Sequence, residues 1–417
     1  MNQILWFKRG GTNRRKAINI PSSKSILIRL LFMLFFSKEK IILKNFSCCE
    51  DVLSMITCLR GLGKKIKCKD SSLTFKKHNK NSTKKKLYVG SSGLTARIIF
   101  MYLLVKKEKK ILLGSKEIYR RPVKDIEVLY KDIVDNINSK VFYKNDGFLP
   151  LKTISNRNVF VVRNRISSQF VTALLLNLHV LNKEIKINIS KVVSKEYIYM
   201  TVKILREFGL NIKRIKEDIL FKKSKLNFKK KYSVEPDCSS ASYFFLISIF
   251  EKGIFFKKSI VSKVQKEINF LNVLKKIGLR IFYIKKKIFL RFRKKKIYSI
   301  SIDCKSIIDS SMSLCLLFLS GIKRVKLYNI YNWNLKECKR IDAISKECKV
   351  LGMRVKKSKN WIIFSVFKNR HNIIFKNYND HRICMTFSLL LKKRNILISN
   401  PNSVKKTFPS FFNELNV

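Results

Sequence analysis

The stretch Pro21–Phe36, PSSKSILIRLLFMLFF, sets a pattern that the rest of the chain repeats. It begins with a proline and two serines and ends in an almost wholly apolar run. Ser22 or Ser23 can cap the first free N–H groups of a helix. Lys24 and Arg29 lie near the start of that helix, where backbone N–H groups and the helix dipole favour an anion. Taken alone, the stretch predicts a capped, buried helix whose two cations are either solvated or bind an anion.

Six segments share this form, a small or polar cluster followed by an apolar helix of about three turns. They start at residues 22, 92, 167, 239, 310 and 380, at intervals of 70, 75, 72, 71 and 70 residues. A second, amphipathic helix is expected after each, from residues 50, 121, 193, 264, 336 and 405. Short β-rich segments lie between the helices. Each repeat therefore predicts two helices and three or four strands.

Six repeats predict an α/β protein of two similar domains, each made of three repeats with the apolar first helices at its centre. We expect residues 21–235 to form the N-terminal domain and residues 236–417 the C-terminal domain. If the first helices run side by side, their N-termini and polar clusters meet. Two such domains facing each other would form a cleft for small, highly charged anions.

The formal charge of +63 is extreme and has two interpretations, nucleic-acid binding or biased composition. Runs of lysine sit between apolar segments, with little aromatic interleaving and no zinc or RNA-binding signature. Alanine occurs at only five positions, which indicates a compositional drift. We therefore expect most of the charge to be solvated, with weak nonspecific binding of polyanions and no specific nucleic-acid partner.

The ten cysteines show no CxxC or Cys/His metal spacing, which predicts reduced thiols in a cytoplasmic protein. The first residues contain no apolar signal core, and the longest apolar runs are too short to span a bilayer. We expect a monomer with no membrane association, no metal and no cofactor.

Six motifs lie in register with the repeat: SSQFVTA (167–173), VSKEY (193–197), VEPDCSSASY (234–243), YNWNLKECKR (331–340), YNDHR (378–382) and KTFP (406–409). In order and spacing they resemble the EPSP synthase family, over the whole chain. The resemblance implies the enolpyruvyl transferase fold, an inverse α/β barrel of βαβαββ-type units, in which residues 1–20 join residues 236–417 in the C-terminal domain. It also implies transfer of the enolpyruvyl group of phosphoenolpyruvate to the 5-hydroxyl of shikimate 3-phosphate, by addition and elimination through a tetrahedral intermediate, in the shikimate pathway to chorismate and the aromatic amino acids.

The resemblance assigns site residues in both domains. Those implied to bind shikimate 3-phosphate are Lys24, Ser25, Arg29, Ser167, Ser168, Gln169, Ser194, Tyr197, Asp309, Asn332 and Lys336. Those implied to bind phosphoenolpyruvate are Lys24, Ser91, Gly93, Arg121, Gln169, Arg340, Arg382 and Lys406. The implied catalytic residues are Lys24, Asp309, Glu337 and His381, with Glu337 as the proton donor and Asp309 with Lys24 acting on the hydroxyl. Asp380 completes the anion site.

Simpler interpretations compete with several of these roles. Asp309 fits a helix N-cap, and His381 a structural histidine. Lys336 and Arg340, which fall at i and i+4, fit a surface turn held by Glu337. Arg97, in the segment GSSGLTAR (90–97), fits either an anion-binding role or a surface cation. Ser167 fits a helix cap, and Arg120 a solvated neighbour of Arg121.

Three other functions remain open. A sister transferase acting on a nucleotide sugar shares the architecture, but it carries a loop cysteine in the second repeat, and no cysteine lies between residues 69 and 237. A nucleic-acid-binding protein explains the charge but not the order of the motifs. An inactive relic would keep the motifs, and two departures from the family pattern, Ser91 for asparagine and Leu94 for threonine, agree with it.

Overall fold

The computed structural model describes residues 4–7, 16–78, 84–106, 108, 110–119, 159–161, 167–181, 184–251, 254–257, 260–284, 287–366, 373–393 and 395–416. The chain divides into two compact units. Unit 1 consists of Met1–Ser23 and Glu235–Val417, and unit 2 consists of Lys24–Val234. The chain thus passes between the units twice, beside the crossover points expected near residues 20 and 235.

Three apolar helices form the centre of unit 2: α1 (Lys24–Phe35), α3 (Gly93–Lys106) and α6 (Ser168–Leu181). They are buried nearly all round, as their lack of a polar face predicts. Helix α6 packs against α3 and α1, and the second helices α2 (Glu50–Gly61) and α7 (Glu196–Glu207) pack against α1. The second helix expected from residue 121 lies outside the described residues; the short α4 (Lys116–Tyr119) precedes it.

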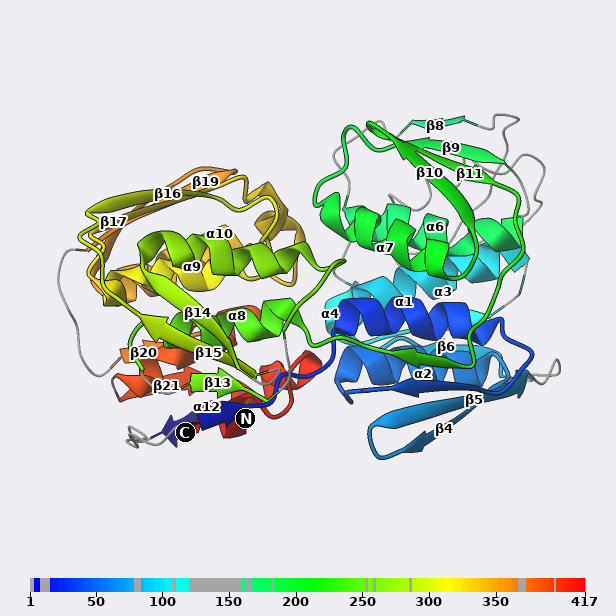
Figure 1. The fold of residues 1–417 in the computed structure, drawn as a ribbon, viewed down its shortest axis with the longest axis horizontal. Helices are drawn as coiled ribbons and strands as arrows, with labels where there is room; N and C mark the ends of the chain where they lie inside the picture. The colour runs from blue at the N-terminus through cyan, green and yellow to red at the C-terminus, as the bar shows by residue number, and fades with distance from the viewer. Residues whose placement is uncertain are drawn as a thin grey trace. The chain divides into compact units, whose positions relative to one another are not determined.

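Two four-stranded sheets cover opposite sides of these helices (Figure 1). One has the order β12-β3-β5-β4, with β12 (Lys231–Ser233), β3 (Ile41–Lys44), β5 (Ser72–His78) and β4 (Lys64–Lys69). The other has the order β10-β11-β9-β8, with β10 (Asn211–Ile215), β11 (Asp218–Lys222), β9 (Ile185–Asn188) and β8 (Val159–Val161). A parallel pair, β6 (Lys86–Tyr88) and β7 (Ile111–Leu113), forms a third sheet.

Unit 1 has the same plan. Its central helices are α8 (Cys238–Ile247), the 3₁₀ helix η2 (Ser311–Ser320) and α11 (His381–Ser388), which η4 (Leu389–Lys392) continues. Helix η2 contacts both α8 and α11. The second segments are η1 (Lys266–Asn269) with α9 (Phe270–Ile277), α10 (Arg340–Val350), and η5 (Pro401–Lys406) with α12 (Phe411–Leu415).

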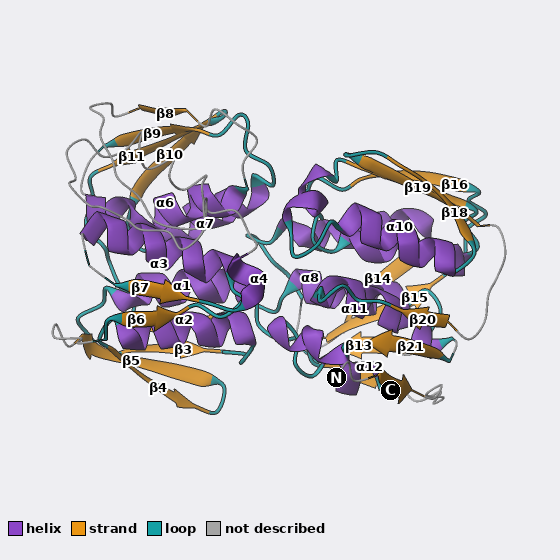
Figure 2. Cartoon of the chain, turned by 180° about the vertical axis from the view of Figure 1, so that it is seen from behind, coloured by secondary structure: helices purple, strands orange, loops and turns teal. Residues whose placement is uncertain are grey.

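Three sheets surround the helices of unit 1, and Figure 2 shows them from behind. The first contains β14 (Leu279–Ile284), β15 (Lys287–Phe292), β13 (Ile254–Phe256) and β2 (Lys16–Ile18). The second contains β16 (Ser299–Asp303), β17 (Arg324–Tyr328), β19 (Trp361–Val366) and β18 (Met353–Lys357). The third contains β1 (Ile4–Phe7), β21 (Ile396–Ser399) and β20 (Ile373–Phe375). Strand β1 pairs with β21 and strand β2 pairs with β13, so both lie in sheets made by the later repeats.

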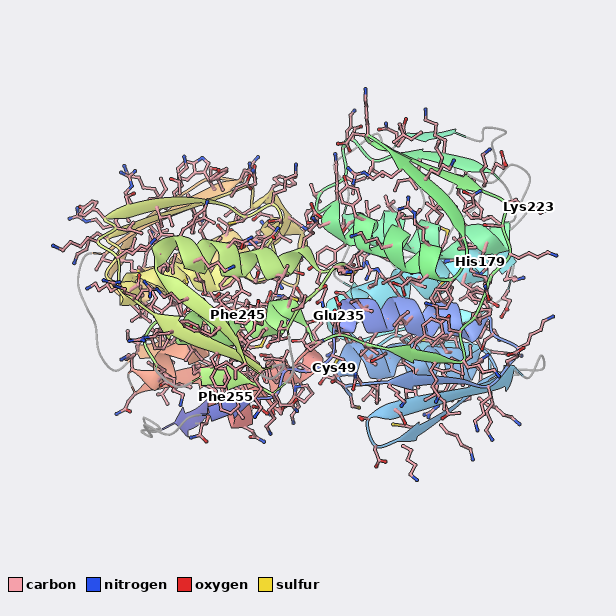
Figure 3. All side chains as sticks on the ribbon, in the orientation of Figure 1. Cys49, His179, Lys223, Glu235, Phe245 and Phe255 are labelled. Carbon is pink, nitrogen blue, oxygen red and sulfur yellow. The ribbon has the colours of Figure 1, made fainter. Side chains whose placement is uncertain are left out.

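The two segments that pass between the units are hydrogen-bonded to each other. The Ser23 N–H donates to the carbonyl of Glu235 at 2.9 Å, and the Asp237 N–H donates to the carbonyl of Pro21 at 2.8 Å. Figure 3 labels Glu235 at this point. These hydrogen bonds hold the two segments that pass between the units side by side. The hydroxyl oxygen of Ser23 is buried and makes no hydrogen bond with the described groups, so the expected cap by Ser23 is wrong.

Two expected helices differ in form. The fifth first helix is 3₁₀ rather than α, since the hydroxyls of Ser310, Ser311 and Ser313 each donate to the carbonyl three residues earlier and compete with the α pattern. The segment from residue 405 is two short pieces rather than one helix. Pro409 separates them, because proline lacks an N–H and disfavours helical backbone at the residue before it.

The lysine runs lie where the composition predicts. Every residue of Lys84–Lys86, Lys229–Lys231 and Lys294–Lys296 is exposed. Figure 3 shows nitrogen-tipped side chains pointing outward from the sheets. Every helix in the described part of the chain is too short or too polar to cross a bilayer.

The first prediction concerns Gly278, which ends α9 with φ of +119°. A Cβ atom there would lie 1.9 Å from the carbonyl oxygen of Arg293. The matched control is Gly321, with φ of +96°, where a Cβ would meet only the flexible end of Lys294 at 2.9 Å. We expect Gly278→Ala to lower the free energy of unfolding by about 3 kcal/mol and Gly321→Ala by about 1 kcal/mol. Urea unfolding followed by circular dichroism measures both, and equal losses would contradict the clash with Arg293.

Candidate active site

The cluster in unit 1 is centred on Asp309, which lies just before η2. Its carboxylate is 3.1 Å from Lys336 Nζ, 3.4 Å from Arg340 Nη1 and 3.6 Å from Arg382 Nη2. The N-cap interpretation of Asp309 is wrong, because η2 has Ser310 as its N-cap residue. The carboxylate of Asp309 instead interacts with three cationic side chains, so it balances their charge rather than capping the helix.

Arg340 is the first residue of α10 and is only 1% exposed. Its Nε donates to Asp380 Oδ2 at 2.7 Å, and its Nη2 donates to Glu337 Oε2 at 2.8 Å and to Asp380 Oδ1 at 3.2 Å. Burial opposes the charge, but Asp380, Glu337 and Asp309 together raise the pKa of Arg340 above its ordinary value. Arg340 is therefore a permanently charged group bound on several sides by carboxylates.

Glu337 also meets a second cation, since its Oε1 is 3.1 Å from Lys406 Nζ. Lys336 is buried apart from 13% of its side chain, and burial lowers its pKa more than Asp309 raises it. Residues 336–340 do not form the surface turn that their sequence suggests. They also do not form a helical turn, because Lys336 has extended backbone after η3 (Tyr331–Leu335) and α10 begins only at Arg340.

Arg382 joins the starts of the three central helices of unit 1. Asp380 caps α11 by accepting the Arg382 N–H at 2.9 Å. The guanidinium of Arg382 donates to the carbonyl of Asp309 at 2.8 Å, before η2, and to the hydroxyl of Ser239 at 3.1 Å, in the first turn of α8. The expected meeting of helix N-termini is thus confirmed within this unit.

The two remaining site residues predicted in unit 1 are buried beside this cluster. His381 is the first residue of α11, and Asn332 lies in η3. The indole N–H of Trp333 donates to the carbonyl of Ile308 at 2.9 Å, which fixes η3 next to the residue that precedes Asp309.

In unit 2, Lys24 is the first residue of α1 and forms an ion pair with Asp51 at 2.9 Å. Asp51 is buried in the first turn of α2. The pair places an ammonium group at the N-terminus of a central helix, where the backbone already attracts anions.

The side chain of Arg29 links α1 to α6 and α7 by hydrogen bonds, and it is 2% exposed. It donates to Thr201 Oγ1 at 2.8 Å, Thr172 Oγ1 at 3.3 Å, the Tyr197 carbonyl at 3.2 Å and the Ser25 carbonyl at 2.6 Å. Burial lowers its pKa to about 10. The implied role of Arg29 and Ser25 in holding shikimate 3-phosphate stays a prediction, and the structure places the guanidinium among protein groups.

Arg97 makes the same kind of link between α3 and α6. It donates to the carbonyl of Gly93 at 2.8 Å and to Gln169 Oε1 at 3.1 Å, and its guanidinium lies 4.5 Å from the ring centroid of Phe170. The side chain is buried, so the surface-cation interpretation of Arg97 is wrong. Gly93 opens α3, just after Ser91.

Three of the predicted serines of unit 2 lie at the starts of α6 and α7. Ser168 is the first residue of α6, and Ser167 forms a parallel bridge with Val193. Ser194 follows with a φ of +59°, and its carbonyl accepts the Tyr197 N–H at 3.2 Å. Arg121 and its neighbour Arg120 lie outside the described residues.

Sequence reasoning missed Asp51, Glu267 and Ser239. Asp51 and Glu267 lie near the start of the second segment in the first and fourth repeats, so the register of the repeat could have pointed to them. Ser239 opens the fourth repeat, within the motif VEPDCSSASY (234–243), and nothing in that motif distinguishes it from the neighbouring serines. Among the described residues, no group of three or more His, Cys, Asp or Glu side chains is placed to hold a metal ion.

Comparison with solved structures shows which fold the chain has. An EPSP synthase from Acinetobacter baumannii is similar over 100% of this chain and 98% of its own, with a TM-score of 0.77 and 18% identity. The enolpyruvyl transferase NikO from Streptomyces tendae has a TM-score of 0.71 and 12% identity, over 100% of this chain and 97% of its own. The fold is therefore that of the enolpyruvyl transferases.

Sequence comparison narrows the class to one family. The family model of EPSP synthase (3-phosphoshikimate 1-carboxyvinyltransferase) matches residues 8–415. A protein of that name from Buchnera aphidicola subsp. Cinara cedri (strain Cc) is 35% identical over 415 residues, covering 95% of this chain and 93% of the relative. One from Mannheimia haemolytica is 30% identical over 423 residues, covering 95% of each. The chain belongs to the EPSP synthase family.

The second prediction tests the buried guanidinium. Arg340→Lys keeps the charge but cannot reach three carboxylates with one ammonium group, so we expect the free energy of unfolding to fall by about 3 kcal/mol. Arg280→Lys, an exposed arginine on β14, is the matched control and should change it by less than about 0.5 kcal/mol. Chemical unfolding of the two variants decides the question, and equal stability would show that the contacts of Arg340 do not form.

Proposed function

We propose that this chain transfers the enolpyruvyl group of phosphoenolpyruvate to the 5-hydroxyl of shikimate 3-phosphate and releases phosphate. The observation that carries the proposal is the cluster of Lys336, Arg340, Arg382 and Lys406 around Asp309 and Glu337, in a chain of the EPSP synthase family. Both substrates carry a carboxylate and a phosphate, so they need several cations held in place before they arrive.

Without ligand, the cations of the cluster are paired with carboxylates of the protein. Arg340 and Lys406 share Glu337 between them. Phosphoenolpyruvate presents its own carboxylate and phosphate to Arg340, Arg382 and Lys406, and these anions take the place of Glu337 as partners. Ligand binding thus frees Glu337 for proton transfer and keeps every buried cation compensated.

The addition step requires a proton donor and a proton acceptor on two different carboxyl groups. Glu337 gives a proton to the methylene carbon of phosphoenolpyruvate, while Asp309 with Lys24 takes the proton of the attacking hydroxyl. The new carbon–oxygen bond produces the tetrahedral adduct. Elimination reverses the first proton transfer: Glu337 removes a proton from the new methyl group, the bond to the phosphate oxygen breaks, and the double bond re-forms. Arg382 and Lys406 stabilise the departing phosphate.

The serines at the starts of α6 and α7 suit the 3-phosphate of the second substrate. Ser167, Ser168 and Ser194 place hydroxyls near helix N-termini, where the helix dipole favours an anion. Gln169 and Tyr197 are proposed to contact the ring, with Asn332 and Lys336 from unit 1. His381 lies among these charges and is proposed to assist catalysis. The expectation that residues of both units serve one pair of ligands stays a prediction, as does the role of Arg121.

We propose a monomer that acts in the cytoplasm on these two small molecules. The lysine runs are exposed, and because they lack aromatic interleaving we propose no dedicated nucleic-acid site for them.

The third prediction is the dependence of phosphate release on the second substrate. Phosphate release from phosphoenolpyruvate should require shikimate 3-phosphate, and Glu337→Gln should lower kcat by about 100-fold or more because the proton donor is lost. A coupled phosphate assay with and without shikimate 3-phosphate measures this.

Two outcomes would contradict the proposal. Release of phosphate without shikimate 3-phosphate would remove the assigned acceptor. No release under any condition, in a protein that is folded by circular dichroism, would favour the inactive relic.

A further inference from the structure

Glu267 is a buried carboxylate of unit 1 that has no role in the site assigned so far. It lies in η1, the start of the second segment of the fourth repeat, and is 7% exposed. Its Oε1 accepts the backbone N–H of Asp309 at 3.1 Å, and its Oε2 accepts the hydroxyl of Ser310. Both bonds end on the two residues that lead into η2, so Glu267 fixes the backbone that carries Asp309.

The charged groups that face Glu267 come from other elements. Asp309 raises its pKa, and Arg382 of α11 lowers it. Two thiols are also near, Cys238 on α8 and Cys304 after β16, and burial raises the pKa of Cys304 to about 12 and that of Cys238 further. Since both thiols stay neutral near pH 7, the charge beside Glu267 comes from Asp309 and Arg382.

Burial raises the pKa of Glu267 to about 7, with the charge of Asp309 as the second cause, against the hydrogen bond from Ser310. The carboxyl group of Glu267 therefore loses its proton between pH 6 and pH 8, the range over which kcat is to be measured. A negative charge beside Asp309 makes proton uptake by its carboxylate more favourable, and loss of that charge makes it less so.

The same place in the first repeat also holds an acidic side chain. Asp51, in the first turn of α2, forms an ion pair with Lys24 at the start of α1. Glu267 contacts the start of η2 in a comparable way. In both units the second segment thus directs a buried carboxylate at the residues that open a central helix.

We propose that Glu267 is a positioning residue for the reaction: it holds Asp309 in place through the backbone and adjusts the basicity of its carboxylate. The inference rests on the proposed function, in which Asp309 accepts the proton of the attacking hydroxyl. Glu267 touches neither substrate in this account. It acts through Asp309 alone, so its loss should change proton transfer more than substrate binding.

The fourth prediction compares Glu267→Gln with wild type. Glutamine keeps an acceptor for the Asp309 N–H and a polar partner for Ser310, and it removes the charge. We expect kcat at pH 8 to fall by about 10- to 100-fold, with KM for both substrates within about threefold. The wild-type kcat should rise from pH 6 to pH 8 as Glu267 loses its proton, and this rise should be absent in the variant.

The matched control is Glu347→Gln. Glu347 is a buried carboxylate of α10 that accepts the N–H of Lys376 at 3.1 Å and the hydroxyl of Tyr378 at 2.6 Å. It therefore loses the same kinds of contact on mutation. We expect a similar loss of thermal stability in this variant, with the pH profile of kcat unchanged in shape.

A measurement of folding gives a second readout that does not depend on activity. Folding raises the pKa of Glu267, so protonated Glu267 stabilises the folded state. This contribution to the free energy of unfolding is complete below about pH 4.5 and is lost as the pH rises through about 7. The Tm of wild type minus the Tm of Glu267→Gln should therefore decrease from pH 5 to pH 8.

These outcomes separate the inference from the proposed function. If wild type shows phosphate release that depends on shikimate 3-phosphate, the proposed function stands. A Glu267→Gln variant with the wild-type rate and pH profile then overturns the positioning role alone. The role is also overturned if Glu347→Gln loses the pH dependence in the same way, or if Tm shows no pH-dependent difference.

Discussion

The burial of the Arg340 guanidinium is the constraint on which the cluster in unit 1 depends. A buried cation is tolerated only when carboxylates compensate it with good geometry. Its partners come from separate places in the fold: Asp380 from the cap of α11, Asp309 from the turn before η2, and Glu337 from the segment before α10. The elements that carry these residues must therefore pack correctly before the charges balance, and the packing brings Lys336, Arg382 and Lys406 to the same place.

Unit 2 meets the same constraint with different residues. Arg29 and Arg97 are buried near the starts of central helices and bind hydroxyls, carbonyls and an amide of neighbouring elements. Neutral acceptors hold these two arginines, whereas carboxylates hold Arg340. Arg382 combines both, with hydrogen bonds to a carbonyl and a hydroxyl and an ion pair with Asp309. The apolar bodies of the helices supply the burial energy, and the polar first turns supply the specific contacts. A repeat of about 70 residues thus produces, in each unit, a set of helix N-termini joined by arginines.

The repeat made the fold predictable from the sequence. The six apolar segments and the amphipathic segments after them follow from hydrophobic pattern and interval. The pairing of the first strands with the later repeats is implied by the family resemblance and does not follow from the pattern. Local form was less predictable where side chains compete with the backbone, as the serines of η2 do, and where Lys336 stays extended before α10. The burial of Arg29 could not be inferred, since Thr201 and Thr172 lie far along the chain. The roles of Asp51 and Glu267 could not be predicted from the sequence. Acidic residues near helix starts are common, and only the tertiary structure shows which group each one contacts.

The central claim is that the cations around Asp309 and Glu337 exchange protein carboxylates for the anionic groups of the substrates. A crystal structure of the Glu337→Gln variant with shikimate 3-phosphate and phosphoenolpyruvate bound tests this most directly, because slow turnover preserves both ligands. The account predicts carboxylate or phosphate oxygens of phosphoenolpyruvate within about 3 Å of nitrogens of Arg340, Arg382 or Lys406. Substrates bound elsewhere, with these three side chains still facing only protein groups, would contradict it.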